Sequence, residues 1–373
     1  RGGPAGRRPR PRSAAVARLA SAVGLEGPKM NVVVFGATGY IGRAVVQELA
    51  ARGHEVVAFA REKSGIGGEQ SATDVQASFG EYSNVKVITG DVMDEASLAS
   101  ALGKLGRVDG AVCCLASRSG GRKDSFDIDY QATINCHKAV KQAGGAHFVL
   151  LSAICVQKPL LAFQEAKLKA EAYIKENSGD MAYYLVQPTA FFKSLLGQVK
   201  GVKGGAPYVM FGDGSVACKP ISEEDLAAFI CDCFWDPAVK NSTLPVGGPG
   251  KAMTFREQGV LLHESIGKEP NLISVPTALF DVINGVLDFL AGLWPEKLSD
   301  VAEYGKIGKY YATECMLVLD KETGTYREDL TPSYGRTSLR DFLTEAMKEG
   351  STLMESQRLG EQGLGARLGV DAE

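Results

Sequence analysis

The stretch Asn31-Val32-Val33-Val34-Phe35-Gly36-Ala37-Thr38-Gly39-Tyr40-Ile41-Gly42 decides the fold of this 373-residue chain. A β-branched apolar run is followed by a glycine-rich turn, after which apolar residues recur at helical spacing until Gly53. This pattern predicts a strand, a tight turn and a helix. Glycines in such a turn let the backbone approach a pyrophosphate, to which the helix start adds partial positive charge. We therefore expect a dinucleotide to bind at Gly36, Ala37, Thr38, Gly39, Tyr40, Ile41 and Gly42.

Apolar runs and helical patterns alternate along the following 150 residues. Strands are predicted over 56–60, 85–88, 111–115, 148–151 and 184–186, and helices from Asp94 through Leu102, over 128–143 and over 162–176. This alternation is typical of an α/β fold, a Rossmann-type doubly wound parallel sheet covered on both faces. Beyond about residue 190, Gly and Pro punctuate shorter segments, which predicts a smaller C-terminal substrate-binding lobe. Ser222 and Asp225 are predicted to form a capping box at the start of a helix.

The charge of the chain is divided unevenly, although the formal net charge is only −3. Residues 1–29 hold six Arg and one Lys against Glu26, a net +6, so the remainder carries −9. An Arg-rich, acid-poor start is typical of an organelle transit peptide, with a disordered basic arm as the alternative. The acidic body argues against a nucleic-acid partner. We expect segments 1–29 (transit-peptide remnant, disordered), 30–190 (NADP-binding Rossmann domain), 191–346 (substrate-binding lobe, some elements returning to the core) and 347–373 (flexible tail).

The cysteines do not show the spacing of a metal site. Most of the eight cysteines lie in apolar runs, which favours buried thiols. Cys231 and Cys233 are separated by one residue, and no His lies at ligand spacing from them. We therefore expect no metal. The apolar run over 275–294 is interrupted by Asp281 and Asp288. It therefore predicts a buried or interfacial helix rather than a membrane span.

The end of the second predicted strand indicates which nucleotide binds. Arg61 and Lys63 stand where an NAD site usually carries an acidic residue, and both would pair with a 2′-phosphate. This favours NADPH as the cofactor. Further cofactor contacts are expected after later strands, at Asp91 and Val92 near the adenine, Ala116 and Ser117 on the ribose side, and Pro188 and Thr189.

The chain resembles the short-chain dehydrogenase/reductase superfamily, in its atypical branch with Gly-x-x-Gly-x-x-Gly spacing. Ser152, after the fifth strand, matches that superfamily's serine, and Lys167 matches the lysine of its Tyr-x-x-x-Lys motif. The tyrosine position holds Phe163. The resemblance implies catalytic roles for Ser152 and Lys167, with Lys167 binding the nicotinamide ribose. Phe163 cannot donate a proton, which puts carbonyl reduction in doubt.

Longer stretches resemble one family of plant and algal chloroplast enzymes, the reductases of the 8-vinyl group of divinyl chlorophyllide a. The resemblance covers roughly 31–343 and is carried by 113–121, 151–159, 188–194, 207–214, 246–251 and 331–335, although Gln187 stands where related reductases often carry Arg. It implies NADPH-dependent reduction of a vinyl group of divinyl chlorophyllide, or of divinyl protochlorophyllide, to ethyl in chlorophyll biosynthesis. The implied location is the chloroplast, with peripheral association to thylakoid or envelope membranes as a further expectation.

A conjugated vinyl group accepts hydride at its terminal carbon, with charge spread over the macrocycle, so no acid need be aimed at a carbonyl oxygen. The proton donor stays open among Lys167, Ser152, Tyr130 and water. A flat tetrapyrrole needs apolar walls and a few cations. The second lobe offers Phe280, Trp294 and Lys219, and the residues expected to bind substrate are Phe163, Phe191, Phe192, Lys193, Tyr208 and Phe211.

Two other functions fit the same cofactor site. One is a non-catalytic NADP(H)-binding redox sensor, which the phenylalanine at position 163 favours. The other is a reductase of a phenylpropanoid-type aromatic substrate, with the same lysine and a different pocket.

Overall fold

A seven-stranded parallel sheet forms the centre of the protein. The computed structural model describes residues 25, 27–64 and 70–348, so the predicted tail beyond 348 and nearly all of the basic start lie outside the described residues. The strands are ordered β11-β8-β7-β6-β1-β2-β5, and every neighbouring pair is parallel. They span β1 Asn31–Phe35, β2 Glu55–Ala60, β5 Val85–Thr89, β6 Gly110–Cys113, β7 His147–Leu151, β8 Ala182–Pro188 and β11 Ser242–Val246. The predicted Rossmann-type fold is confirmed.

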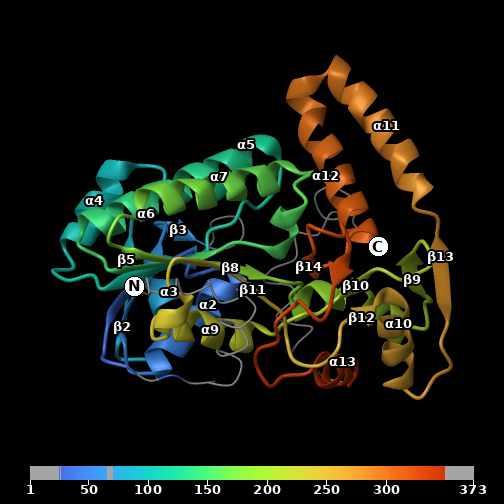
Figure 1. Ribbon diagram of the computed structural model, residues 1–373, viewed down its shortest axis with the longest axis horizontal. Coiled ribbons are helices and arrows are strands. Elements are labelled where there is room, and N and C mark those ends of the chain that lie inside the picture. Colours follow the sequence, from blue (N-terminus) through green and yellow to red (C-terminus); the bar gives the residue numbers. More distant parts are fainter. Residues whose placement is uncertain (1–24, 26, 65–69, 349–373) are drawn as a thin grey trace, which may run out of the picture.

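Helices cover both faces of this sheet, and each face has its own apolar core (Figure 1). One face carries α2 Tyr40–Ala51, α3 Ala72–Ala77 and α9 Glu223–Asp232. The other carries α4 Glu95–Gly103, α5 Arg122–Asp124, α6 Thr133–Gln142 and α7 Ala162–Asn177. The strands read as nearly continuous apolar runs because both faces are buried. The chain reverses its direction of strand addition between β1 and β6, where such folds form their ligand crevice.

The helix predicted over 128–143 begins earlier and is irregular. Residues Ser125–Ala132 form a π-helical segment between α5 and α6. Wide turns of this kind are frequent at functional sites because they redirect side chains. Here the segment carries Asp129, whose side chain is buried.

The Rossmann unit extends past residue 190, since α9 packs on α2 and β11 adds the edge strand beside β8. Ser222 caps α9 as predicted, accepting from the backbone N–H of Asp225 at 3.1 Å. The reciprocal half of the capping box is not formed. The carboxylate of Asp225 instead accepts from the backbone N–H groups of Arg336 and Thr337, which holds the C-terminal segment against the Rossmann unit.

The remaining elements form a lobe beside the carboxyl edge of the sheet (Figure 1). They are α8 Val199–Lys203, β9 Tyr208–Phe211, β10 Ala217–Cys218, β12 Met253–Thr254, α10 Phe255–Glu264, β13 Leu272–Val275, β14 Val318–Leu319, β15 Tyr326–Arg327 and α13 Leu339–Met347, with short 3₁₀ turns at Ile154–Gln157, Phe192–Gln198 and Pro237–Val239. A small hairpin, β3 Lys63–Ser64 with β4 Gln70–Ser71, lies beyond β2.

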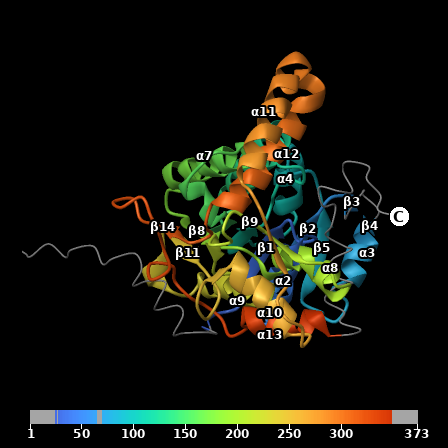
Figure 2. The same cartoon turned by 90° about the vertical axis from the view of Figure 1, so that its right-hand side faces the viewer.

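Two long helices, α11 Ala278–Leu293 and α12 Pro295–Thr313, form a hairpin that projects from this lobe (Figures 1 and 2). The glycine punctuation of the region predicts only short elements, and α12 is not anticipated by it. Gly305 and Gly308 on α12 let the helices approach, because a Cβ at either position would come within 3.4 Å of a side chain of α11. Within the described part of the chain, every helix is too short or too polar to span a bilayer.

Candidate active site

The glycine-rich turn between β1 and α2 has the shape that a pyrophosphate requires. Gly36 has a φ of +75°, and a Cβ at that position would lie 2.8 Å from the carbonyl oxygen of Cys114. A Cβ on Gly42 would lie 2.1 Å from the Gly36 carbonyl oxygen. Neither position tolerates a side chain. No side chain caps the N-terminus of α2 and its first turn holds no acid, so the free N–H groups remain available to an anion. The turn therefore fits a dinucleotide.

The side chain of Tyr40 links this turn to the second lobe. Its hydroxyl donates to Glu223 at the start of α9. Lys193 lies over its ring at 5.0 Å, and the ring of Phe191 packs edge-on at 6.1 Å. Burial raises the pKa of the Tyr40 hydroxyl, and the carboxylate of Glu223 raises it further, so the phenol keeps its proton. Lys193, expected at the substrate, lies beside the dinucleotide turn.

The residues expected around the adenosine lie at the carboxyl ends of β2 and β5. Arg61 and Lys63 follow β2, and both are exposed. Asp91 is exposed and accepts from the backbone N–H of Met93. Val92 is packed in the core.

A buried ion pair lies at the carboxyl end of β6. The ammonium of Lys167 on α7 is 2.9 Å from a carboxylate oxygen of Asp129, and their side chains are only 9% and 1% exposed. The other oxygen of Asp129 accepts from the backbone N–H of Ser117 at 3.3 Å. Burial alone would lower the pKa of Lys167, but the carboxylate of Asp129 outweighs burial and the pKa is raised. Lys167 is therefore a fixed cation next to the predicted ribose-side residues.

Ser152 occupies a different environment from the one its predicted role implies. Its hydroxyl donates to Glu171 at 2.6 Å, and the same carboxylate oxygen accepts from the side-chain amide of Gln187 at 2.8 Å. All three side chains are buried. The hydroxyl proton is thus directed into the packing between α7 and β8. A direct proton transfer from Ser152 to substrate would first have to break the hydrogen bond to Glu171.

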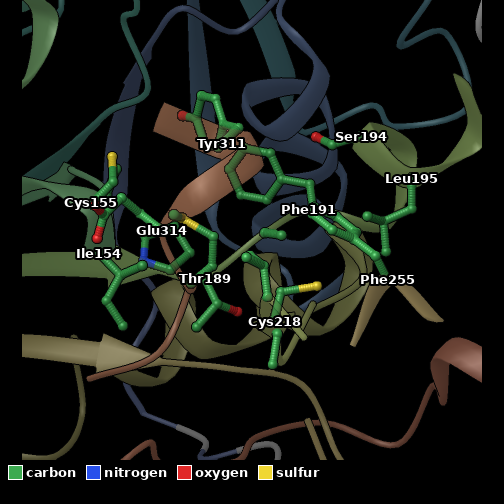
Figure 3. A pocket seen from close by; sticks show the side chains of 16 residues that line it. Ile154, Cys155, Thr189, Phe191, Ser194, Leu195, Cys218, Phe255, Tyr311 and Glu314 are labelled. Carbon is green, nitrogen blue, oxygen red and sulfur yellow. The ribbon is translucent and has the colours of Figure 1, made fainter. Parts of the chain in front are cut away.

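An apolar cavity of about 480 Å³ opens at the carboxyl ends of β7 and β8 (Figure 3). Its size falls within the range of small-molecule sites. Phe191, which lines it, also packs on Tyr40, so the cavity adjoins the dinucleotide turn. The lining residues are Ala153, Ile154, Cys155, Pro188, Thr189, Ala190, Phe191, Ser194, Leu195, Val216, Ala217, Cys218, Phe255, Tyr311, Glu314 and Met316.

Two of the six predicted substrate residues lie in the apolar core of the lobe. Phe192 is fully buried against Phe342, with ring centroids 4.9 Å apart, and Tyr208 is buried in the same core cluster of the lobe. These two aromatic residues belong to the lobe core because a small lobe needs large side chains to fill it. Of the other residues named as substrate-binding, Phe191 lines the cavity and Phe163 packs against the neighbouring apolar cluster. Phe211 packs on Phe280, at 5.0 Å between ring centroids.

Three parts of the site are not predicted from the sequence. Asp129 and Glu171 are charged residues on amphipathic helices, where a solvated position is the usual interpretation. Tyr311 lies on the unanticipated helix α12. Two features of the sequence could have indicated them. Asp129 and Tyr130 form a polar pair within the predicted helix, and Pro295 stands at the first position of a run of helix formers, where a helix often begins.

All eight cysteines are free thiols, six of them buried. Among residues 25, 27–64 and 70–348, no three His, Cys, Asp or Glu side chains gather as metal ligands would.

Comparisons with known proteins show which family the chain belongs to. A family model described as NAD(P)H-binding matches residues 36–237. The chain is 54% identical over 342 residues to a divinyl chlorophyllide a 8-vinyl-reductase from Zea mays, covering 91% of this chain and 84% of that one. It is 52% identical over 344 residues to the Arabidopsis thaliana enzyme of the same name, covering 90% and 81%.

Solved structures of lower identity share the fold. The structure of AtPrR2 with NADP⁺ and (+)-pinoresinol has a TM-score of 0.62 at 20% identity, covering 85% of this chain and 99% of that one. An isoflavone reductase has a TM-score of 0.61 at 20% identity, with the same coverage. The identity above 50% across nine-tenths of the sequence decides the assignment: the chain belongs to the divinyl chlorophyllide a 8-vinyl-reductase family of NAD(P)H-binding oxidoreductases.

Proposed function

We propose that this protein uses NADPH to reduce the 8-vinyl group of divinyl chlorophyllide a, or of divinyl protochlorophyllide, to an ethyl group in the chloroplast. The observation that carries the proposal is the identity of 52–54% to enzymes of that name over about 90% of the chain. An apolar cavity that adjoins the dinucleotide turn supports it, since a flat macrocycle needs such walls next to the cofactor.

NADPH, when bound, supplies a hydride equivalent to the terminal vinyl carbon. The residues of the chain would hold the cofactor in place and supply positive charge beside it. The turn at Gly36 and the uncapped start of α2 would hold the pyrophosphate, and Arg61 and Lys63 would meet the 2′-phosphate. Lys167, fixed by Asp129, would place a positive charge on the ribose side, where it favours the build-up of negative charge during reduction.

The walls of the cavity determine what reaches the reacting atoms. Phe191, Leu195, Phe255 and Met316 give it an apolar lining, which excludes water and favours a conjugated ring. The carboxylate of Glu314 does not oppose this, because Lys158 pairs with one of its oxygens at 2.6 Å and Tyr326 donates to the other at 2.7 Å.

We propose further that the protein associates with a membrane surface through α11. Seven apolar residues on this helix and its end are more than 40% exposed, at the spacing of one helical face: Leu279, Val282, Ile283, Val286, Phe289, Leu293 and Trp294. The hairpin projects from the body in both views (Figures 1 and 2), so a lipid surface can reach that face. An amphipathic helix of this kind lies in the interface, where an apolar pigment would also be found.

The catalytic proposal is tested by incubating the purified chain with divinyl chlorophyllide a and NADPH and recording the absorption spectrum. Loss of a conjugated vinyl group shifts the absorption to shorter wavelength, and the shift must require both protein and NADPH. Consumption of NADPH with a phenylpropanoid substrate, without any change in the pigment, would favour the aromatic reductase instead. Binding of NADPH with no turnover of either substrate would favour the redox sensor.

A further inference from the structure

The reaction needs a proton as well as a hydride, and most polar groups near the cavity are already engaged. Thr189 donates to the backbone oxygen of Lys219, and both carboxylate oxygens of Glu314 have partners. Ser152 donates to Glu171. Lys167 is paired with Asp129 and does not line the cavity. None of these groups presents a free proton to a ligand in the cavity.

Tyr311 lines the cavity, as Thr189 and Glu314 do, but the partner of its hydroxyl is a thiol, which is a weak acceptor. It comes from α12, and its hydroxyl contacts the thiol of Cys155. Cys155 lies in the 3₁₀ turn Ile154–Gln157, which follows β7. Figure 3 shows the tyrosine hydroxyl on the side of the cavity where Cys155 lies. The 3₁₀ turn that holds Cys155 packs on α7, the helix that carries Lys167.

Neighbouring contacts hold Tyr311 in this position. The adjacent residue, Tyr310, is buried and donates from its hydroxyl to the backbone oxygen of Cys155 at 2.9 Å. The two tyrosine rings pack edge to face, with centroids 5.7 Å apart. This bond anchors α12 on the loop after β7, which fixes where Tyr311 enters the cavity.

We propose that Tyr311 is the proton donor of the vinyl reduction, and that it replaces from the second lobe the acid that Phe163 cannot provide. The inference rests on the proposed function. Hydride addition to the terminal carbon turns the vinyl CH₂ into CH₃ and leaves an electron pair on the inner carbon and the conjugated ring. That pair takes the proton from the Tyr311 hydroxyl, completing the ethyl group. The tyrosinate is then reprotonated by water.

The surroundings of Tyr311 suit a donor that must hold its proton until it is needed. Although 43% of the residue is exposed, burial of the hydroxyl raises its pKa, and the neighbouring Cys155 raises it further. The phenol therefore stays protonated at neutral pH. A carbanion on carbon is a far stronger base than a phenolate, so the transfer remains downhill.

The experiment compares Tyr311→Phe with the wild type and with Tyr304→Phe, the same substitution on the same helix away from the cavity lining. We expect Tyr311→Phe to lower kcat by 10²–10⁴-fold, the usual contribution of a general acid. Its Kd for NADPH, and for pigment in the absence of NADPH, should stay within about threefold of wild type, measured by fluorescence quenching. Tyr304→Phe should match wild type in all three quantities.

A stereochemical readout separates a proton donor from a merely structural residue. In D₂O the inner carbon becomes a CHD centre, and a donor fixed in the protein delivers deuterium to one face only. We expect a single configuration from wild type and Tyr304→Phe, and both configurations from the residual product of Tyr311→Phe. Unchanged kcat and a single configuration in Tyr311→Phe would overturn the proposal. So would loss of configuration in Cys155→Ala but not in Tyr311→Phe. If wild type does not reduce the pigment, the proposed function fails instead.

Discussion

The ammonium group of Lys167 lies 2.9 Å from the carboxylate of Asp129, and both side chains are withdrawn from solvent. A buried cation with a fixed partner keeps its charge and position, whereas a surface lysine samples many rotamers. The carboxylate also accepts from the backbone N–H of Ser117, so one acid joins α7 to the loop after β6. Asp129 is therefore a positioning residue for Lys167.

Replacing Asp129 by Asn should destabilise the protein by about 3 kcal/mol, because it leaves a buried ammonium without its counter-charge. Urea unfolding monitored by intrinsic fluorescence measures this. The double variant Asp129→Leu with Lys167→Met removes both charges and should recover most of the loss. If the double variant lost as much stability as Asp129→Leu and Lys167→Met lose separately when added together, the two residues would not act as a pair.

Cofactor preference should depend on Arg61 and Lys63. Changing either residue to Ala removes one cation facing a 2′-phosphate and should raise the Kd for NADPH about tenfold, which corresponds to one charge-assisted contact of about 1.4 kcal/mol. NADH lacks that phosphate and serves as the internal control, so its Kd should not change. Equal weakening of both nucleotides would mean that these residues act through the fold.

Acid should destabilise the protein partly through His137. Burial lowers the pKa of this residue to about 4, with the positive charge of Lys141 contributing, and its Nε2 is 2.9 Å from the Ser178 hydroxyl. The unfolded chain binds the proton near pH 6.5 and the folded chain only near pH 4. Stability is therefore lost as pH falls through this window.

The expected contribution of His137 between pH 7 and pH 5 is about 2 kcal/mol, given that pKa difference. His137→Gln does not titrate, so its free energy of unfolding should fall by about 2 kcal/mol less than that of wild type over the same range. Urea midpoints at the two pH values provide the measurement. Parallel losses in both proteins would contradict the assignment.

Membrane association should depend on the exposed face of α11. The double change Val286→Glu with Phe289→Glu places two charges on that face and should reduce flotation with galactolipid vesicles by at least tenfold. Turnover of detergent-dispersed pigment should stay within about twofold of wild type. Leu160→Glu, an equally exposed apolar residue elsewhere, is the matched control. Vesicle binding that Leu160→Glu reduces as much as the α11 double variant would show that α11 is not the contact surface.

The sequence predicts the sheet and the dinucleotide turn well, because both depend on local patterns. The run over 31–42 holds the strand, the turn and the helix start within twelve residues, and the structure follows it closely. Asp94, where a helix is predicted to begin, caps that helix by accepting from the backbone N–H of Ala96.

The substrate side of the site depends on contacts between distant segments, which local patterns do not encode. Phe191 and Phe192 are neighbours in sequence, yet one lines the cavity and the other fills the lobe core. Tyr311 meets Cys155 from a helix more than 150 residues away. Asp129 is buried because a π-helical turn directs it toward Lys167, which lies on a different helix.

The proposed reaction is tested most directly by a single turnover of the full chain with divinyl chlorophyllide a and NADPH deuterated at C4 on the transferred face, analysed by mass spectrometry. We expect a product heavier by three mass units, one deuterium from the cofactor and one proton from the protein or water, with the deuterium in the methyl of a new ethyl group. A pigment of unchanged mass, or one reduced without deuterium, would contradict the proposed reaction.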